Sequence, residues 1–130
     1  MSETVLVVDD HPLVLTTLAC TLVHAGYRVL QAASGEEALT LASQSGETIH
    51  LLVCDLILPG IPGTELARKL AALHPQVRCL FITGLPHHPR VTAEVTAALL
   101  PKPFLPHVLI RRARELLSPH LRVMPATRAS

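Results

Sequence analysis

Short apolar runs alternate along this chain with segments of helical spacing, and no other feature limits its fold as strongly. The runs VLVV (5–8), LLVC (51–54) and CLFI (79–82) are apolar throughout, which is typical of parallel strands covered on both faces. YRVLQAA (27–33) is more polar and ALL (98–100) is short, so these two are expected at the sheet edges. The alternation predicts a doubly wound α/β fold with a five-stranded parallel sheet and helices on both faces.

The segments with helical spacing are 14–25, 34–43, 64–74, 106–116 and, weakest of all, 90–97. In the second segment, Ser34 is followed three residues later by Glu37, which is the pattern of a capping box at a helix start. In the third, Leu66, Leu70 and Leu73 repeat at helical spacing. We expect these three leucines to face the sheet.

Length and composition favour a single cytoplasmic domain. The 130 residues are expected to form one domain at 1–117, followed by a flexible C-terminal tail at 118–130. No apolar run reaches the roughly 18 residues that span a bilayer, so membrane insertion is not expected. The net charge of +1 at pH 7 produces no field that would favour direct nucleic acid binding. Three widely spaced cysteines, with no CxxC pair, indicate reduced thiols rather than disulfides or a zinc site.

Polar side chains follow four of the expected strands at the point where each strand ends. They are Asp9, Asp10, Asp55, Thr83 and Lys102. The carboxyl ends of parallel strands meet at one edge of the sheet, where ligands of such folds bind. One acid after a strand often only caps a turn, but five polar residues at a common edge indicate a site.

Three carboxylates, a hydroxyl and an ammonium together suit phosphoryl transfer to a carboxylate. Carboxylates packed together repel one another, and Mg²⁺, which prefers oxygen ligands, relieves that repulsion. The ion also draws charge from a phosphoryl group as the group moves to a nucleophilic carboxylate. Lys102 and Thr83 are suited to hold the remaining phosphoryl oxygens.

Four motifs occur in an order and at a spacing that resemble one known family: VLVVDD (5–10), DLILPGIPG (55–63), ITG (82–84) and KPF (102–104). The chain resembles the receiver domains of response regulators in two-component signalling, from about Thr4 to Leu117. The resemblance implies a flavodoxin-like strand order of 2-1-3-4-5 and a cis peptide bond before Pro103. It also implies that a histidine kinase or a phosphotransfer protein supplies the phosphoryl group, and it leaves open whether the domain forms a homodimer.

The resemblance also assigns roles to the polar residues. Asp55 is expected to accept the phosphoryl group, and Thr83 and Lys102 are expected to contact it. Asp9, Asp10, Asp55 and the main-chain carbonyl of Ile57 are expected to bind Mg²⁺. These are the catalytic and metal-binding residues predicted for the chain.

Three positions depart from the usual receiver pattern. Pro62 stands where an acid or amide is common, and Leu99 replaces an aromatic residue that often moves on activation, so the route of switching is left open. Ile57 and Leu85 flank the expected path of the hydrolytic water with apolar side chains, which cannot orient water by hydrogen bonding. We therefore expect slow loss of the phosphoryl group, and a phosphoacceptor rather than an enzyme in its own right.

Two alternatives remain at this stage. A pseudo-receiver would keep the fold as an interaction module without the chemistry, but all five site residues are present. A magnesium-dependent phosphatase of the haloacid dehalogenase type carries its nucleophile in a DxDx[TV] motif after the first strand, whereas here an acidic pair comes first and no DxD occurs. The first and last motifs resemble receivers of hybrid sensor histidine kinases and DDHPLV resembles receivers of transcription regulators, with the hybrid kinase slightly favoured.

Overall fold

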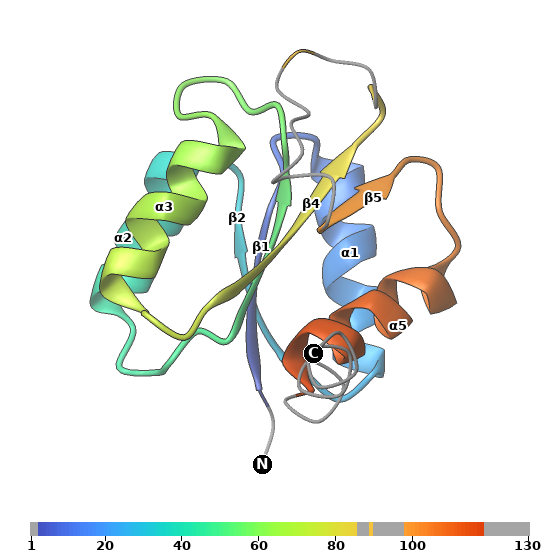
Figure 1. The fold of residues 1–130 in the computed structure, drawn as a ribbon, viewed down its shortest axis with the longest axis horizontal. Coiled ribbons are helices and arrows are strands. Elements are labelled where there is room, and N and C mark those ends of the chain that lie inside the picture. The colour runs from blue at the N-terminus through green and yellow to red at the C-terminus, as the bar shows by residue number, and fades with distance from the viewer. Residues whose placement is uncertain (1–2, 86–88, 90–97, 119–130) are drawn as a thin grey trace, which may run out of the picture.

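A five-stranded parallel sheet with helices on both faces forms the structure, a computed structural model that describes residues 3–85, 89 and 98–118 (Figure 1). Its elements are β1 Thr4–Val8, α1 Pro12–His24, β2 Arg28–Ala32, α2 Gly35–Gln44, β3 Leu51–Asp55, α3 Gly63–Leu73, β4 Arg78–Thr83, β5 Leu99–Pro101 and α5 Pro106–Leu117. The strand order β2-β1-β3-β4-β5 confirms the expected order and the expected edge strands. The helix expected at 90–97 and the tail from 119 lie outside the described residues.

Each face of the sheet has its own hydrophobic core. In β1, Leu6 and Val8 pack in the core on the side of α2 and α3, whereas Val5 and Val7 pack in the core on the side of α1 and α5. All four side chains are fully buried. A strand covered on both faces has no polar side to present, which explains why the central strands are apolar throughout.

The helix predictions are confirmed in most details and wrong in one. Ser34 Oγ accepts a hydrogen bond from Glu37 N–H at 3.1 Å, while the Glu37 carboxylate accepts one from Ala33 N–H. Leu66 and Leu70 are fully buried, but Leu73 is 47% exposed, so its expected place in the core is incorrect. Leu73 is the last residue of α3, and no further helical turn follows to cover it.

Parallel pairing brings the ends of the central strands to the same edge of the sheet. Val8, the last residue of β1, pairs with Cys54, and Asp55 pairs with Ile82 in β4. Asp9 and Asp55 therefore lie next to each other at this edge of the sheet.

The Lys102–Pro103 peptide bond is cis, as the family resemblance implies. Within the part of the chain that the structure describes, we find no helix with the length and hydropathy of a membrane span.

Gly63 allows α3 to begin directly against the end of β3. A Cβ atom at position 63 would lie 2.7 Å from the main-chain oxygen of Asp55 and 3.1 Å from that of Leu56. Both atoms belong to the backbone, so neither can move aside as a flexible side chain would. The absence of a side chain at this position therefore sets how closely the helix approaches Asp55.

Gly63→Ala should lower the free energy of unfolding by about 1–3 kcal/mol, because the added methyl group has to displace backbone. Urea denaturation measures this change. Gly46→Ala is the matched control, since a Cβ at position 46 meets no atom within 4 Å, and it should change the stability by less than about 1 kcal/mol. Equal losses in the two variants would contradict the steric argument.

Candidate functional site

Three carboxylates meet at the carboxyl edge of the sheet. Asp9 and Asp10 follow β1, and Asp55 ends β3. One oxygen from each lies within 4.8 Å of the others. We call this group of three the acidic pocket. Asp9 is buried, Asp55 is half-buried and Asp10 is exposed, so the pocket opens to solvent at one side.

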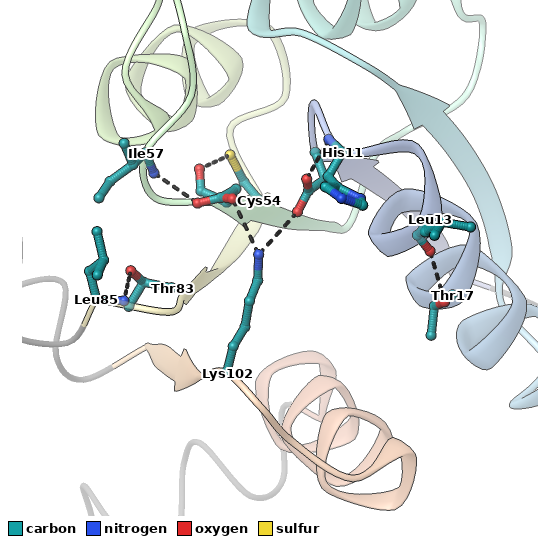
Figure 2. A network of polar contacts seen from close by, with 10 residues as sticks. His11, Leu13, Thr17, Cys54, Ile57, Thr83, Leu85 and Lys102 are labelled. Atoms are coloured by element: carbon teal, nitrogen blue, oxygen red, sulfur yellow. Dashed lines mark hydrogen bonds and ion pairs between the residues drawn. The ribbon is translucent and has the colours of Figure 1, made fainter.

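Lys102 supplies the ammonium that faces the acidic pocket. Its Nζ lies 3.3 Å from Asp55 Oδ2 and 3.5 Å from Asp9 Oδ2 (Figure 2). The Lys102 side chain is 26% exposed. One positive charge thus faces three carboxylates, and the pocket retains an excess of negative charge that a divalent cation would offset.

Asp9 carries the least satisfied polar atom of the site. Its Oδ1 accepts a hydrogen bond from His11 N–H at 2.8 Å. Its Oδ2 is buried and, among the described residues, has no hydrogen-bond partner. Burial raises the pKa of Asp9 above its usual value, against the opposing effects of the His11 N–H and Lys102, and the charges of Asp55 and Asp10 raise it further. A buried carboxylate oxygen of this kind fits a hard metal ion, which would take it as a ligand.

Asp55 is held in place at one oxygen and faces the cation with the other. Oδ1 accepts a hydrogen bond from Ile57 N–H at 3.0 Å, and Oδ2 faces Lys102. The Asp55 side chain is 16% exposed, so it is both oriented and open to a reactant. Ile57, predicted from sequence as a main-chain metal ligand, therefore lies next to the carboxylate that would share the ion.

Thr83 lies at the same sheet edge, at the end of β4, and is almost fully buried. Its Oγ1 accepts a hydrogen bond from Leu85 N–H at 3.0 Å (Figure 2). Within the described part of the chain no hydrogen bond joins this hydroxyl to the acidic pocket. The structure thus gathers Asp9, Asp10, Asp55 and Lys102 at one place and sets Thr83 at the end of the neighbouring strand.

The main-chain N–H groups that orient the carboxylates were missed by sequence reasoning. The N–H groups of His11 and Ile57 orient Asp9 and Asp55, and every residue except proline carries such a donor. The residue types at positions 11 and 57 therefore gave no sign that these two N–H groups would orient the carboxylates. The close approach at Gly63 had a weak signal, since glycine in a loop before a helix is common for other reasons.

An apolar groove adjoins the Lys102 side of the acidic pocket. It has a volume of about 500 Å³. It lies between α1 and the segment after β5, and Leu13, Val14, Thr17, Leu18, Pro103 and Phe104 line it together with Lys102. Leu13 is 74% exposed, which is unusual for a large apolar residue and marks the groove as a surface open to contact.

Comparison with known proteins identifies the family. The model of the response regulator receiver domain matches residues 5–114. Sensor kinase CckA of Brucella abortus (strain 2308) is 33% identical over 119 residues, which are 89% of this chain and 13% of that protein. Transcriptional activator protein ExaE of Pseudomonas putida is 36% identical over 121 residues, 89% of this chain and 56% of that protein. The chain thus spans well under two thirds of either relative.

A solved structure gives the same result at the level of the fold. The crystal structure of the receiver domain from the hybrid histidine kinase CckA has a TM-score of 0.75 and 36% sequence identity, and the match covers 89% of this chain and all of that one. The strand order, the acidic pocket and Lys102 agree with this similarity. The chain belongs to the response regulator receiver domain family.

Proposed function

We propose that Asp55 accepts a phosphoryl group from a phosphohistidine, with Mg²⁺ bound in the acidic pocket, as one step of a two-component phosphorelay. In this step a carboxylate oxygen of Asp55 forms a bond to phosphorus while the bond from phosphorus to the donor imidazole nitrogen breaks. The observation that carries the proposal is the orientation of Asp55 between the Ile57 N–H at 3.0 Å and the Lys102 ammonium at 3.3 Å. Transfer of this kind depends mainly on positioning and charge neutralisation.

Asp9, Asp10, Asp55 and the main-chain carbonyl of Ile57 would hold the ion. The buried Oδ2 of Asp9, which accepts no hydrogen bond from the described residues, supports this assignment. When bound, Mg²⁺ supplies positive charge to the phosphoryl oxygens. Lys102 already faces Asp55 Oδ2 and would neutralise a further phosphoryl oxygen. Thr83, whose hydroxyl now accepts from Leu85 N–H, would reorient toward the phosphoryl group and so report its presence to the loop after β4.

Receiver domains interact with histidine kinases or with phosphotransfer proteins, and we propose such a protein as the donor here. A donor that places its phosphohistidine over Asp55 has to cover the neighbouring surface as well. The apolar groove beside Lys102, with Leu13 at its rim, would give that protein a surface to bind. The receiver unit is proposed at residues 1–117, with 118–130 as a tail, and its origin in a hybrid kinase remains part of the proposal.

The two alternatives are less well supported. A pseudo-receiver has no need of a lysine that contacts two pocket carboxylates, as Lys102 does. A phosphatase of the haloacid dehalogenase type would have its nucleophile after the first strand. Here the oriented and partly exposed carboxylate is Asp55, the last residue of β3. Phosphoryl acceptance by Asp55 accounts for both features.

Asp9→Asn should stabilise the protein when no divalent cation is present and abolish stabilisation by Mg²⁺. The raised pKa of Asp9 means that its ionised form is held at a cost in the folded state, so removal of the charge should raise the free energy of unfolding. Mg²⁺ at millimolar concentration should raise the melting temperature of the parent protein and leave that of Asp9→Asn unchanged.

Asp10→Asn is the matched control for the magnesium experiment. Asp10 is exposed, so its substitution should weaken the effect of Mg²⁺ without stabilising the protein in the absence of the ion. Thermal denaturation with and without MgCl₂ measures both quantities. A Mg²⁺-dependent rise in melting temperature that persists in Asp9→Asn would show that the ion binds elsewhere.

Asp55→Asn should abolish phosphorylation. Incubation with a small acyl phosphate and Mg²⁺ should add one phosphoryl group to the parent protein, seen by intact-mass analysis, because Asp55 is the oriented nucleophile. Glu36→Gln, which removes an exposed carboxylate outside the acidic pocket, should leave the uptake unchanged. Phosphoryl uptake by Asp55→Asn equal to that of the parent would refute the proposed acceptor.

Ile57→Asn should speed the loss of the phosphoryl group from Asp55 by about twofold or more, because an amide can orient the attacking water by hydrogen bonding. Ile57 is half-buried and Leu85 is 58% exposed, and both follow strands that end at this site (Figure 2). The decay of the aspartyl phosphate under saturating Mg²⁺ gives the rate. Ile57→Leu keeps an apolar side chain and should decay like the parent, and an unchanged rate in Ile57→Asn would reject the water-exclusion argument.

A further inference from the structure

The loop of residues 56–62 joins β3 to α3 and follows Asp55 directly (Figure 1). Its first residue, Leu56, donates its N–H to the carbonyl of Ile82 in β4 at 2.9 Å. The carbonyl of Leu56 accepts a hydrogen bond from the N–H of Gly63, the first residue of α3, at 3.3 Å. The two ends of the loop are therefore tied to each other and to the sheet.

Leu58 is buried although it lies in a loop. It is only 4% exposed and belongs, with Leu56, to the hydrophobic core on the side of α2 and α3. Ile57 stands between these two leucines and is half-buried. Loops usually run over the surface, so a leucine that enters the core from a loop fixes the main chain on either side of it.

The residues after Leu58 leave this loop little conformational freedom. Pro59 and Pro62 each have a fixed φ, and a residue that precedes a proline, as Leu58 does, is restricted to extended backbone. Gly60 has a φ of 77°, which glycine adopts without strain. The main chain of the loop is stiff, so the position of the Leu58 side chain determines the position of its neighbour Ile57.

The first turn of α2 lies against the other half of the loop. Ile61 packs on the same core as Leu58, and a Cβ atom at Gly35 would lie 3.2 Å from the Cβ of Ile61. A Cβ atom at Gly60 would lie 2.8 Å from Oε2 of Glu36. The core and α2 therefore both limit movement of the loop.

We propose that Leu58 is a positioning residue for Asp55. Its side chain, anchored in the core, holds Ile57 so that the Ile57 N–H donates to Asp55 Oδ1 at 3.0 Å (Figure 2). The same anchor sets the direction of the Ile57 carbonyl, which would be a ligand of the ion. The inference rests on the proposed function, since it assigns a role toward the phosphoryl acceptor and its ion. Leu58 acts only through the main chain of Ile57.

Truncation of Leu58 would leave a cavity toward which the loop can relax. A displacement of about 1 Å in a reacting group can lower a rate by about a hundredfold. Mg²⁺ requires nearly ideal octahedral geometry, whereas Ca²⁺ accepts longer and more flexible coordination. Loss of the anchor should therefore weaken binding of Mg²⁺ more than binding of Ca²⁺, an effect that general destabilisation would not produce.

The test compares the full chain with Leu58→Ala and with Leu70→Ala as the matched control. Leu70 is fully buried in the same core but belongs to α3, so both variants should lose stability in urea denaturation. Under conditions in which both are folded, NMR titration should show Mg²⁺ binding about tenfold weaker in Leu58→Ala than in Leu70→Ala. Leu58→Ala should also have a lower ratio of Mg²⁺ to Ca²⁺ affinity, and slower phosphoryl uptake from a small acyl phosphate at saturating Mg²⁺.

Amide hydrogen exchange tests the anchor without an ion or a phosphodonor. The Ile57 N–H should exchange about tenfold faster in Leu58→Ala than in Leu70→Ala, because its hydrogen bond to Asp55 is no longer held in place. The His11 N–H, which donates to Asp9, should exchange equally in the two variants. If Leu58→Ala does not fold, Leu58→Val paired with Leu70→Val gives the same comparison with smaller differences.

The possible outcomes separate this inference from the proposed function. If the parent protein binds Mg²⁺, equal Mg²⁺ affinities in Leu58→Ala and Leu70→Ala would overturn the role of Leu58. Equal exchange of the Ile57 N–H in the two variants would overturn it whether or not the parent binds the ion. A parent protein that neither binds Mg²⁺ nor takes up a phosphoryl group would refute the proposed function instead, and the exchange rates would still decide whether Leu58 positions Ile57.

Discussion

Repulsion among three carboxylates at one sheet edge is the constraint on which the chemistry of this protein depends. Asp9, Asp10 and Asp55 lie close enough to share one ion, and Lys102 offsets only part of their charge. Such a cluster would spread apart in a flexible chain, because like charges favour separation. The cluster persists here because the three carboxylates lie at the ends of adjacent strands. The hydrogen bonds between these strands restrict movement of the backbone.

The two hydrophobic cores make this edge rigid. Every residue of β1 is buried, and so is β3 up to Cys54, and the cost of opening either core opposes any separation of the strand ends. Gly63 adds to this rigidity because it lets α3 start in contact with the backbone at Asp55. The carboxylates of the site are therefore fixed, and the Thr83 hydroxyl accepts a hydrogen bond from Leu85 N–H in the loop after β4.

The two ends of the sheet differ in the groups that close them. The carboxyl end concentrates negative charge in the acidic pocket. At the opposite end, both ring nitrogens of His74 bond to main-chain groups, the N–H of Ile49 and the carbonyl of Ala42.

The sequence alone determined the elements and the edge where the site lies. Apolar runs, helical spacing and the Ser34 capping box depend only on residues that are near one another in the sequence. They can therefore be recognised without knowing the fold. The prediction failed at Leu73, which is exposed. Spacing indicates which face of a helix turns toward the sheet, but it does not indicate how far along the helix that face is buried. Tertiary structure decided the rest. Lys102 reaches Asp55 across 47 residues of sequence, and His74 reaches Ala42 across 32. Which oxygen of Asp9 lacks a hydrogen bond depends on groups that only the folded chain brings together.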